Sequence, residues 1–190
     1  MKYLRRLLWF IASRMIMFSV IISLLILTFY LAMNTANIYI LLDDGMKLRT
    51  SVILTREDAN ELRNFFTDDY LNQDQVLNVG LSLDSSPYAD YNITDYNHIL
   101  TLEWMWSWPW EDRAQATIVE RVTNITGTVL AERESRLKNG LISSTPPIWN
   151  GGRYQVTLIR QNGQWKIARC DQTKVILESV PTPRPSAAAG

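Results

Sequence analysis

The chain begins with a long uncharged segment and continues with a region of mixed polar and apolar positions. No residue from Met15 to Leu42 carries a charge, and positions 15–33 read MIMFSVIISLLILTFYLAM. A helix of about 20 apolar residues crosses the hydrocarbon core of a bilayer. The pattern therefore predicts a transmembrane helix at residues 15–38, after a basic segment at residues 1–14.

A cleaved signal peptide is the alternative interpretation of this segment, because KYLRR near the start is basic. Signal peptides have an apolar core of about 7–15 residues and a cleavage site with small residues, which LAMNTAN matches poorly. A retained anchor is therefore favoured. The four cations before the span predict a cytoplasmic N-terminus and an exported remainder; they are Lys2, Arg5, Arg6 and Arg14.

Beyond the span, the spacing of apolar positions predicts one amphipathic helix followed by strands. Residues 39–54 are interpreted as a juxtamembrane linker, or as a continuation of the anchor helix. Thr55 is the expected N-cap of a helix from Arg56 to about Leu71, whose apolar residues recur every three or four positions. Strands are expected at His98–Trp108, Ala114–Val122 and Thr128–Arg136, with a turn at Asn124–Gly127.

The strongest local pattern is the final hairpin, YQVTLIRQ-NG-QWKIARCDQ. Asn162-Gly163 is the preferred dipeptide of a two-residue type I′ turn. This turn predicts that Arg160 lies opposite Trp165. It also predicts one apolar, buried face made of Val156, Leu158, Trp165 and Ile167.

Helices packed on a curved antiparallel sheet, ending in such a hairpin, resemble the NTF2-like superfamily. The residues that carry the resemblance are Gln161 to Ile167, which fit the "xNGxWKI" turn of that α+β, cone-shaped fold. The resemblance implies an NTF2-like domain at residues 55–178 of the exported part. The terminal SVPTPRPSAAAG has three prolines and small residues, which predicts a disordered tail at residues 179–190. A single-pass anchor before such a domain is also similar to the layout of inner-membrane components of type IV secretion and conjugation machines.

Charge and cysteine content narrow the functional classes. The 19 basic and 19 acidic residues balance, and once the four N-terminal cations are removed, 15 basic residues face 19 acidic ones. A mildly acidic body argues against binding of nucleic acid. One cysteine, Cys170, allows no internal disulfide, which suits a bacterial envelope domain better than a cysteine-rich ectodomain.

The sequence contains no recognisable catalytic constellation, and neither a cofactor nor a metal is expected. Resemblance to the enzymes of this fold makes Asp95, His98 and Tyr70 candidates for a pocket inside the cone. A lone histidine gives little support to zinc binding, and Cys170 is expected to be a buried core thiol.

Four tryptophans alternate in WMWSWPW, at positions 104, 106, 108 and 110. Such a row could be the wall of a ligand-binding site, a belt at the membrane interface, or a part of the hydrophobic core that is rich in bulky side chains. The favoured interpretation divides it: Trp104 and Trp106 fill the inner face of the sheet, while Trp108 and Trp110 are available for interaction.

These observations predict a membrane-anchored, extracytoplasmic interaction or scaffold module of a bacterial envelope assembly. Its expected partners are the lipid bilayer and either another protein or further copies of itself. The alternative is a small-molecule binder or isomerase that uses the interior of the cone.

Overall fold

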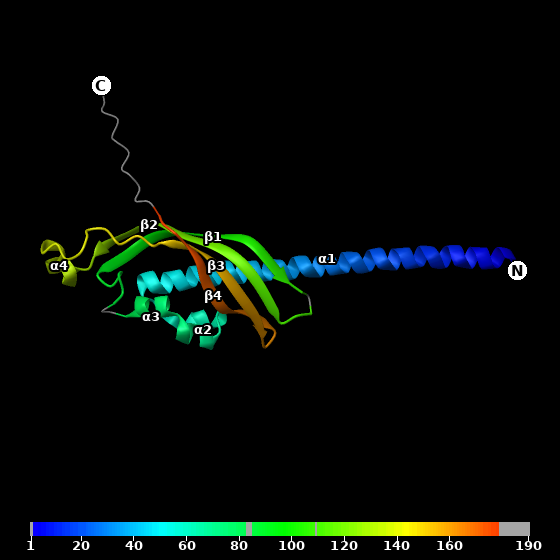
Figure 1. Ribbon diagram of the computed structural model, residues 1–190, viewed down its shortest axis with the longest axis horizontal. Coiled ribbons are helices and arrows are strands. Elements are labelled where there is room, and N and C mark those ends of the chain that lie inside the picture. The colour runs from blue at the N-terminus through cyan, green and yellow to red at the C-terminus, as the bar shows by residue number, and fades with distance from the viewer. Residues whose placement is uncertain (1, 83–84, 109, 179–190) are drawn as a thin grey trace, which may run out of the picture.

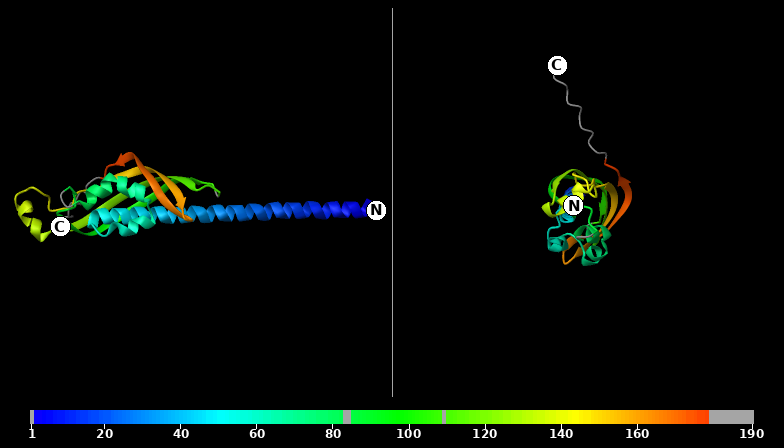
Figure 2. Two further views of the ribbon diagram at one scale, coloured as in Figure 1. Left: turned by 90° about the horizontal axis from the view of Figure 1, so that it is seen from below. Right: turned by 90° about the vertical axis from the view of Figure 1, so that its left-hand side faces the viewer.

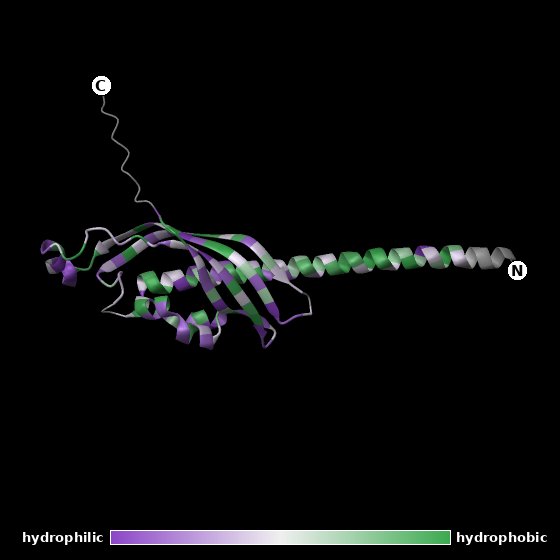
Figure 3. Ribbon diagram, in the orientation of Figure 1, coloured by the Kyte–Doolittle hydropathy of each residue, from purple (hydrophilic) through white to green (hydrophobic). Residues whose placement is uncertain are grey.

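One helix, α1 (Lys2–Thr55), runs from the expected span into the middle of the folded domain (Figure 1). The computed structural model describes residues 2–82, 85–108 and 110–178, so the expected disordered tail at 179–190 lies outside the described residues. Every side chain from Trp9 to Met33 is exposed, and this half of α1 is mostly hydrophobic (Figure 3). Within the described residues, α1 is the one helix long and apolar enough to span a membrane.

The second half of α1 is the central element of the core. Its buried face begins at Asn34 and continues every four residues through Ile38, Leu42 and Met46, as expected for a helix packed along one side. The packed domain therefore begins near Asn34 and not at Thr55. Residues 39–54 continue the anchor helix, as one of the two expected alternatives had it, and half of them are buried. They are not a separate linker.

The single helix expected at Arg56–Leu71 is wrong. Arg56 has a φ of 59°, which ends α1, and two shorter helices follow: the 3₁₀ helix η1 (Ala59–Asn64) and α2 (Asp68–Gln73). Each has its own cap, because the side chains of Asp58 and Thr67 accept hydrogen bonds from backbone N–H groups of the first turn. A third short helix, α3 (Gln75–Leu81), covers the end of α1.

The four strands form one antiparallel sheet in the order β1-β2-β3-β4. Viewed along α1, the sheet curves around the helix (Figure 2). The mixed α+β class is thus confirmed. The strands are β1 (Tyr91–Ser107), β2 (Arg113–Val129), β3 (Gly151–Gln161) and β4 (Gln164–Ile176).

The turn expected at Asn124–Gly127 and the strand expected at Thr128–Arg136 are also wrong. Strand β2 continues through this region to Val129, and Asn124 takes a φ of 55° inside it. The pairing there advances three residues on β2 for two on β1, so Asn124 sits in a bulge. Two short helices come after β2: η2 (Ala131–Arg133) and α4 (Glu134–Lys138).

The final hairpin is confirmed. Asn162 and Gly163 have φ values of 52° and 81°, as a type I′ turn requires, and Arg160 lies opposite Trp165. All four residues of the expected apolar face are buried.

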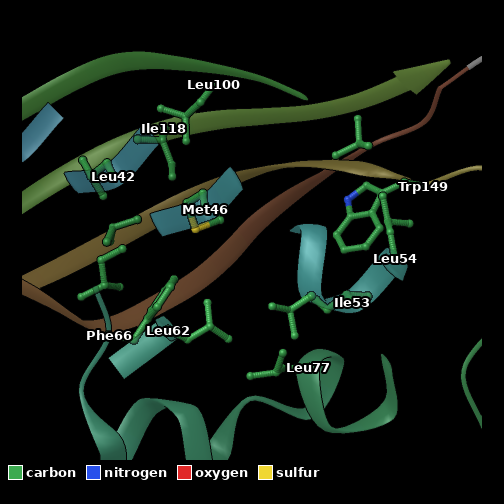
Figure 4. Close-up of a cluster of buried hydrophobic side chains, with 14 of the residues drawn as sticks. Leu42, Met46, Ile53, Leu54, Leu62, Phe66, Leu77, Leu100, Ile118 and Trp149 are labelled. Atoms are coloured by element: carbon green, nitrogen blue, oxygen red, sulfur yellow. The ribbon is translucent and has the colours of Figure 1, made fainter. Parts of the chain in front are cut away.

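The core lies between the buried face of α1, the concave face of the sheet and the short helices (Figure 4). Leu42 and Met46 lie toward the strands, close to Ile118 of β2, while Ile53 lies toward Leu77 of α3. The second half of α1 therefore fills the concave side of the sheet.

The tryptophan row lies on the outer face of the sheet, so the inner position expected for Trp104 and Trp106 is wrong: they are 51% and 52% exposed. The cause is a β-bulge in β1. Leu102 pairs with Ile118, but Trp104 pairs with the next residue of β2, Thr117. Because β1 gains one residue there, the alternation reverses, and Met105 packs against the core instead.

Candidate functional site

A cavity of about 1070 Å³ lies between β4, the end of α1 and the helices α2 and α3. Ligand pockets in proteins commonly occupy about 300–1,000 Å³, so this volume is slightly above that range. Its lining combines aromatic rings with residues of β4 and α3. The aromatic residues are Tyr70, Tyr88, Trp149 and Tyr154, and the strand and helix contribute Cys170, Gln172, Val175, Val76 and Val79.

An ion pair between Arg49 and Asp74 stands in the wall of this cavity. Nε of Arg49 donates to Oδ2 of Asp74 at 2.6 Å, and Nη2 donates to Oδ1 at 2.9 Å. Asp74 is also the N-cap of α3, because Oδ1 accepts from the backbone N–H groups of Val76 and Leu77. The pair therefore fastens α3 to the last turns of α1.

The protonation states of this pair follow from its contacts. Burial favours a higher pKa for Asp74, but the hydrogen bonds and charge of Arg49 outweigh it and hold the pKa below its usual range. Burial likewise opposes the charge of Arg49, whose pKa is nevertheless raised by Asp74. Both groups are charged, and each satisfies the other.

A second polar group lies between α1 and the sheet. Thr50 donates its hydroxyl to Oε1 of Glu120 at 2.9 Å, and Nε2 of His98 lies 3.1 Å from the same oxygen. The side chains of His98 and Glu120 are 2% and 0% exposed. Within the described residues, Oε2 of Glu120 has no hydrogen-bond partner.

The three residues expected to form a pocket do not come together. Tyr70 lines the cavity, and His98 lies in the buried contact with Glu120. Asp95 is exposed on β1 and accepts a hydrogen bond from the backbone N–H of its neighbour Tyr96. A binding role for them, and the interaction role of the exposed Trp108 and Trp110, stay predictions.

The thiol and the tyrosine hydroxyls around the cavity are held in their neutral forms. Burial raises the pKa of the Cys170 thiol to about 12 and that of the Tyr88 hydroxyl to about 12. Burial also raises the pKa of Tyr70 and of Tyr154. No group of three metal-binding side chains occurs within residues 2–82, 85–108 and 110–178. The neutral thiol of Cys170 is a poor nucleophile, because the thiolate is the reactive form.

Strand β4 borders the cavity with a free edge. Near its start, Ile167 exchanges backbone hydrogen bonds with the segment before α2: its N–H donates to Phe65 O at 2.8 Å, and its carbonyl accepts from Thr67 N at 3.0 Å. From residue 168 onward, in the part of the chain that the structure describes, the outer edge of β4 has no backbone partner. An unpaired edge of this kind can accept a further strand.

Sequence reasoning missed Arg49, Asp74 and Glu120. Two signals were available: Arg49 interrupts an apolar helical stripe, and Asp74 precedes an apolar run as an N-cap does. Nothing local marks Glu120, since its partners come from α1 and β1.

Comparison with known proteins adds no family assignment. No family model, curated protein or solved structure matches the chain.

Proposed function

We propose that this protein is a membrane-anchored interaction module of a bacterial envelope assembly, with its N-terminus in the cytoplasm and an NTF2-like domain outside. The observation that carries the proposal is the continuity of α1. The same helix supplies an exposed apolar half and the centre of the domain core. A domain joined in this way is held at a fixed height and orientation above the bilayer, which a scaffold requires and a diffusing enzyme does not.

The polar groups beside the cavity support interaction over catalysis. Arg49 and Asp74 are bonded to each other, and Cys170 is held as a neutral thiol. The hydrogen bonds of Arg49 and Asp74 fix the position of α3 against α1. The cavity wall therefore has a stable shape, as a docking surface needs.

The cavity and the free edge of β4 together form the proposed docking groove. An extended segment of a partner protein can add to β4 as a fifth strand, and alternate side chains would then enter the cavity. Apolar contacts for such side chains are supplied by Val79 of α3 and Val175 of β4, which are both partly exposed.

Photo-crosslinking in native membranes tests the groove. A photoreactive residue at Gln172 should give a product of defined mass, and the added substitution Val79→Asp should reduce its yield at least fivefold. Ile99→Asp is the matched control, because Ile99 has the same 44% exposure as Val79 but lies on β1, outside the cavity. Equal yields in the two variants would contradict the groove.

The orientation is tested separately with reporters fused after Gly190. A reporter active only in the exported compartment should work there. Activity of a reporter that works only in the cytoplasm would contradict the proposed topology.

A second candidate function is small-molecule binding, which the volume and aromatic lining of the cavity favour. Native mass spectrometry of the purified full chain distinguishes the two. A bound molecule that Tyr154→Ala removes, together with no crosslinked partner at Gln172, would favour the binder.

A further inference from the structure

The tryptophan row on β1 ends beside the apolar half of α1. Ser107, the last residue of β1, accepts a hydrogen bond from Nδ2 of Asn34 at 3.0 Å. Asn34 directly follows the apolar segment at 15–33. Trp108 and Trp110 come after Ser107, in the turn to β2, and Figure 1 shows that this turn points along α1 toward its N-terminus. The contact places the turn where a span ending at residue 33 would leave the hydrocarbon.

This end of the domain is held firmly on α1. Nε1 of Trp165, near the start of β4, donates to Oδ1 of Asn34 at 3.0 Å. The backbone N–H of Arg160 on β3 donates to the Asp112 carbonyl at 2.9 Å. Both hairpins are thereby tied to one another and to the same turn of the helix, so the height of the tryptophans relative to the span is fixed.

The rings are exposed and ordered by one another. Trp108 and Trp110 are 41% and 71% exposed and stack with ring centroids 5.0 Å apart. Trp106 meets Trp108 edge-on at 5.1 Å. Indole combines a large apolar surface with a polar N–H, and for that reason tryptophan is enriched where the hydrocarbon of a membrane meets its headgroups.

We infer that Trp108 and Trp110 insert into the headgroup layer of the outer leaflet and fix the tilt of the domain on the membrane. The inference rests on the proposed membrane anchor. Trp104 lies outside this layer. Strands rise about 3.3 Å per residue, so Trp104 lies roughly 10 Å back along β1 from its last residue, Ser107. The polar layer on each side of the hydrocarbon is only about 5–8 Å thick. Trp104 therefore stands above the headgroups.

Electrostatic attraction to anionic lipid does not explain the proposed insertion of the tryptophans. The exposed Glu111 and Asp112 follow the row, and anionic headgroups repel carboxylates. Insertion of indole rings depends on apolar area and on the N–H group, so it should occur in purely zwitterionic bilayers and should not require anionic lipid.

Fluorescence quenching by brominated phosphatidylcholine tests the inference with the full chain in liposomes. Trp9→Phe is introduced throughout, because the exposed Trp9 lies just before the apolar segment and would also be quenched by the lipid. The measured quantity is the tryptophan fluorescence that is lost when the bromine lies near the top of the acyl chains. The additional changes Trp108→Phe and Trp110→Phe should lower this loss at least twofold. The control change Trp104→Phe should leave it nearly unaltered.

Flotation of the liposomes comes first and separates the two proposals. If the protein does not float with the lipid, the membrane anchor itself is wrong. If it floats, and the quenched intensity is the same with and without Trp108 and Trp110, the headgroup contact is overturned and the rings are left to a protein partner. Quenching that requires anionic lipid would also overturn it. Unchanged melting temperatures would show that the Phe variants are folded.

Discussion

Oδ1 of Asn34 accepts a hydrogen bond from the indole Nε1 of Trp165 at 3.0 Å, across 131 positions of sequence. The same amide donates to Ser107. Asn34 is the first buried residue after the apolar segment, so it connects the base of the domain to both hairpins. Through Asn34, both hairpins are bonded to the same turn of α1.

Asn34→Ala should lower the free energy of unfolding by about 1–3 kcal/mol, because the buried Nε1 of Trp165 loses its acceptor. Asn37→Ala is the control: Asn37 lies one turn farther along α1 and is exposed, so its loss should cost less than about 0.5 kcal/mol. Thermal and denaturant unfolding of the full chain in detergent micelles measures both. Equal effects would mean that the bond to Trp165 contributes nothing.

Asp74→Asn should destabilise the domain by about 3–5 kcal/mol, because it leaves the buried charge of Arg49 unpaired. The matched control is Asp68→Asn. Asp68 also pairs with an arginine, Arg63, but the two side chains are 75% and 70% exposed. Exposed pairs contribute about 0–1 kcal/mol, so denaturant midpoints should separate the two variants clearly.

The effect of Asp74→Asn should depend on pH in a definite direction. The pKa of Asp74 is lowered from its ordinary 3.8, so its charged form stabilises the folded state at any pH above that value. The contribution is lost as the pH falls through the folded pKa, below 3.8. The stability difference between wild type and Asp74→Asn should therefore be constant from pH 7 to pH 5 and shrink below pH 4. A difference that already fell between pH 7 and pH 5 would contradict this.

Local patterns determined which parts of the fold could be predicted. The hairpin at Asn162-Gly163 was predictable because two adjacent residues define the turn and alternation defines the buried face. The apolar segment was recognisable from length alone. Both features need no knowledge of what lies across the sheet.

The tryptophan row is a feature that local sequence patterns could not predict correctly. The alternation from Trp104 to Trp110 is real, but its direction depends on a bulge set by pairing with β2, which no position in β1 reveals. The helix expected at 56–71 failed for a similar reason. Its apolar spacing is helical, yet Thr67 caps a new helix and Phe66 forms a bridge to Ile167.

The candidate site was the least predictable part, because its contacts join distant elements. Arg49 and Asp74 are 25 positions apart, and Thr50 and Glu120 are 70 apart. Sequence reasoning interpreted residues 39–54 as a linker or as a continuation of the anchor helix, and neither interpretation pointed to site residues there.

Cys170 gives a direct test of the cavity, since it is the one cysteine in the chain. Its pKa is raised from 9.0 to about 12 by burial, so at pH 8 about one thiol in ten thousand is ionised. Reaction with a disulfide reagent should therefore be at least a hundredfold slower than that of the exposed control, Thr101→Cys with Cys170→Ser. Between pH 8 and pH 10, the rate of Cys170 should rise about tenfold per pH unit, while that of the control levels off near pH 9. Denaturant should abolish the difference in rate between Cys170 and the control. Similar rates at pH 8 in the folded chain would mean that the thiol is not buried in the cavity wall.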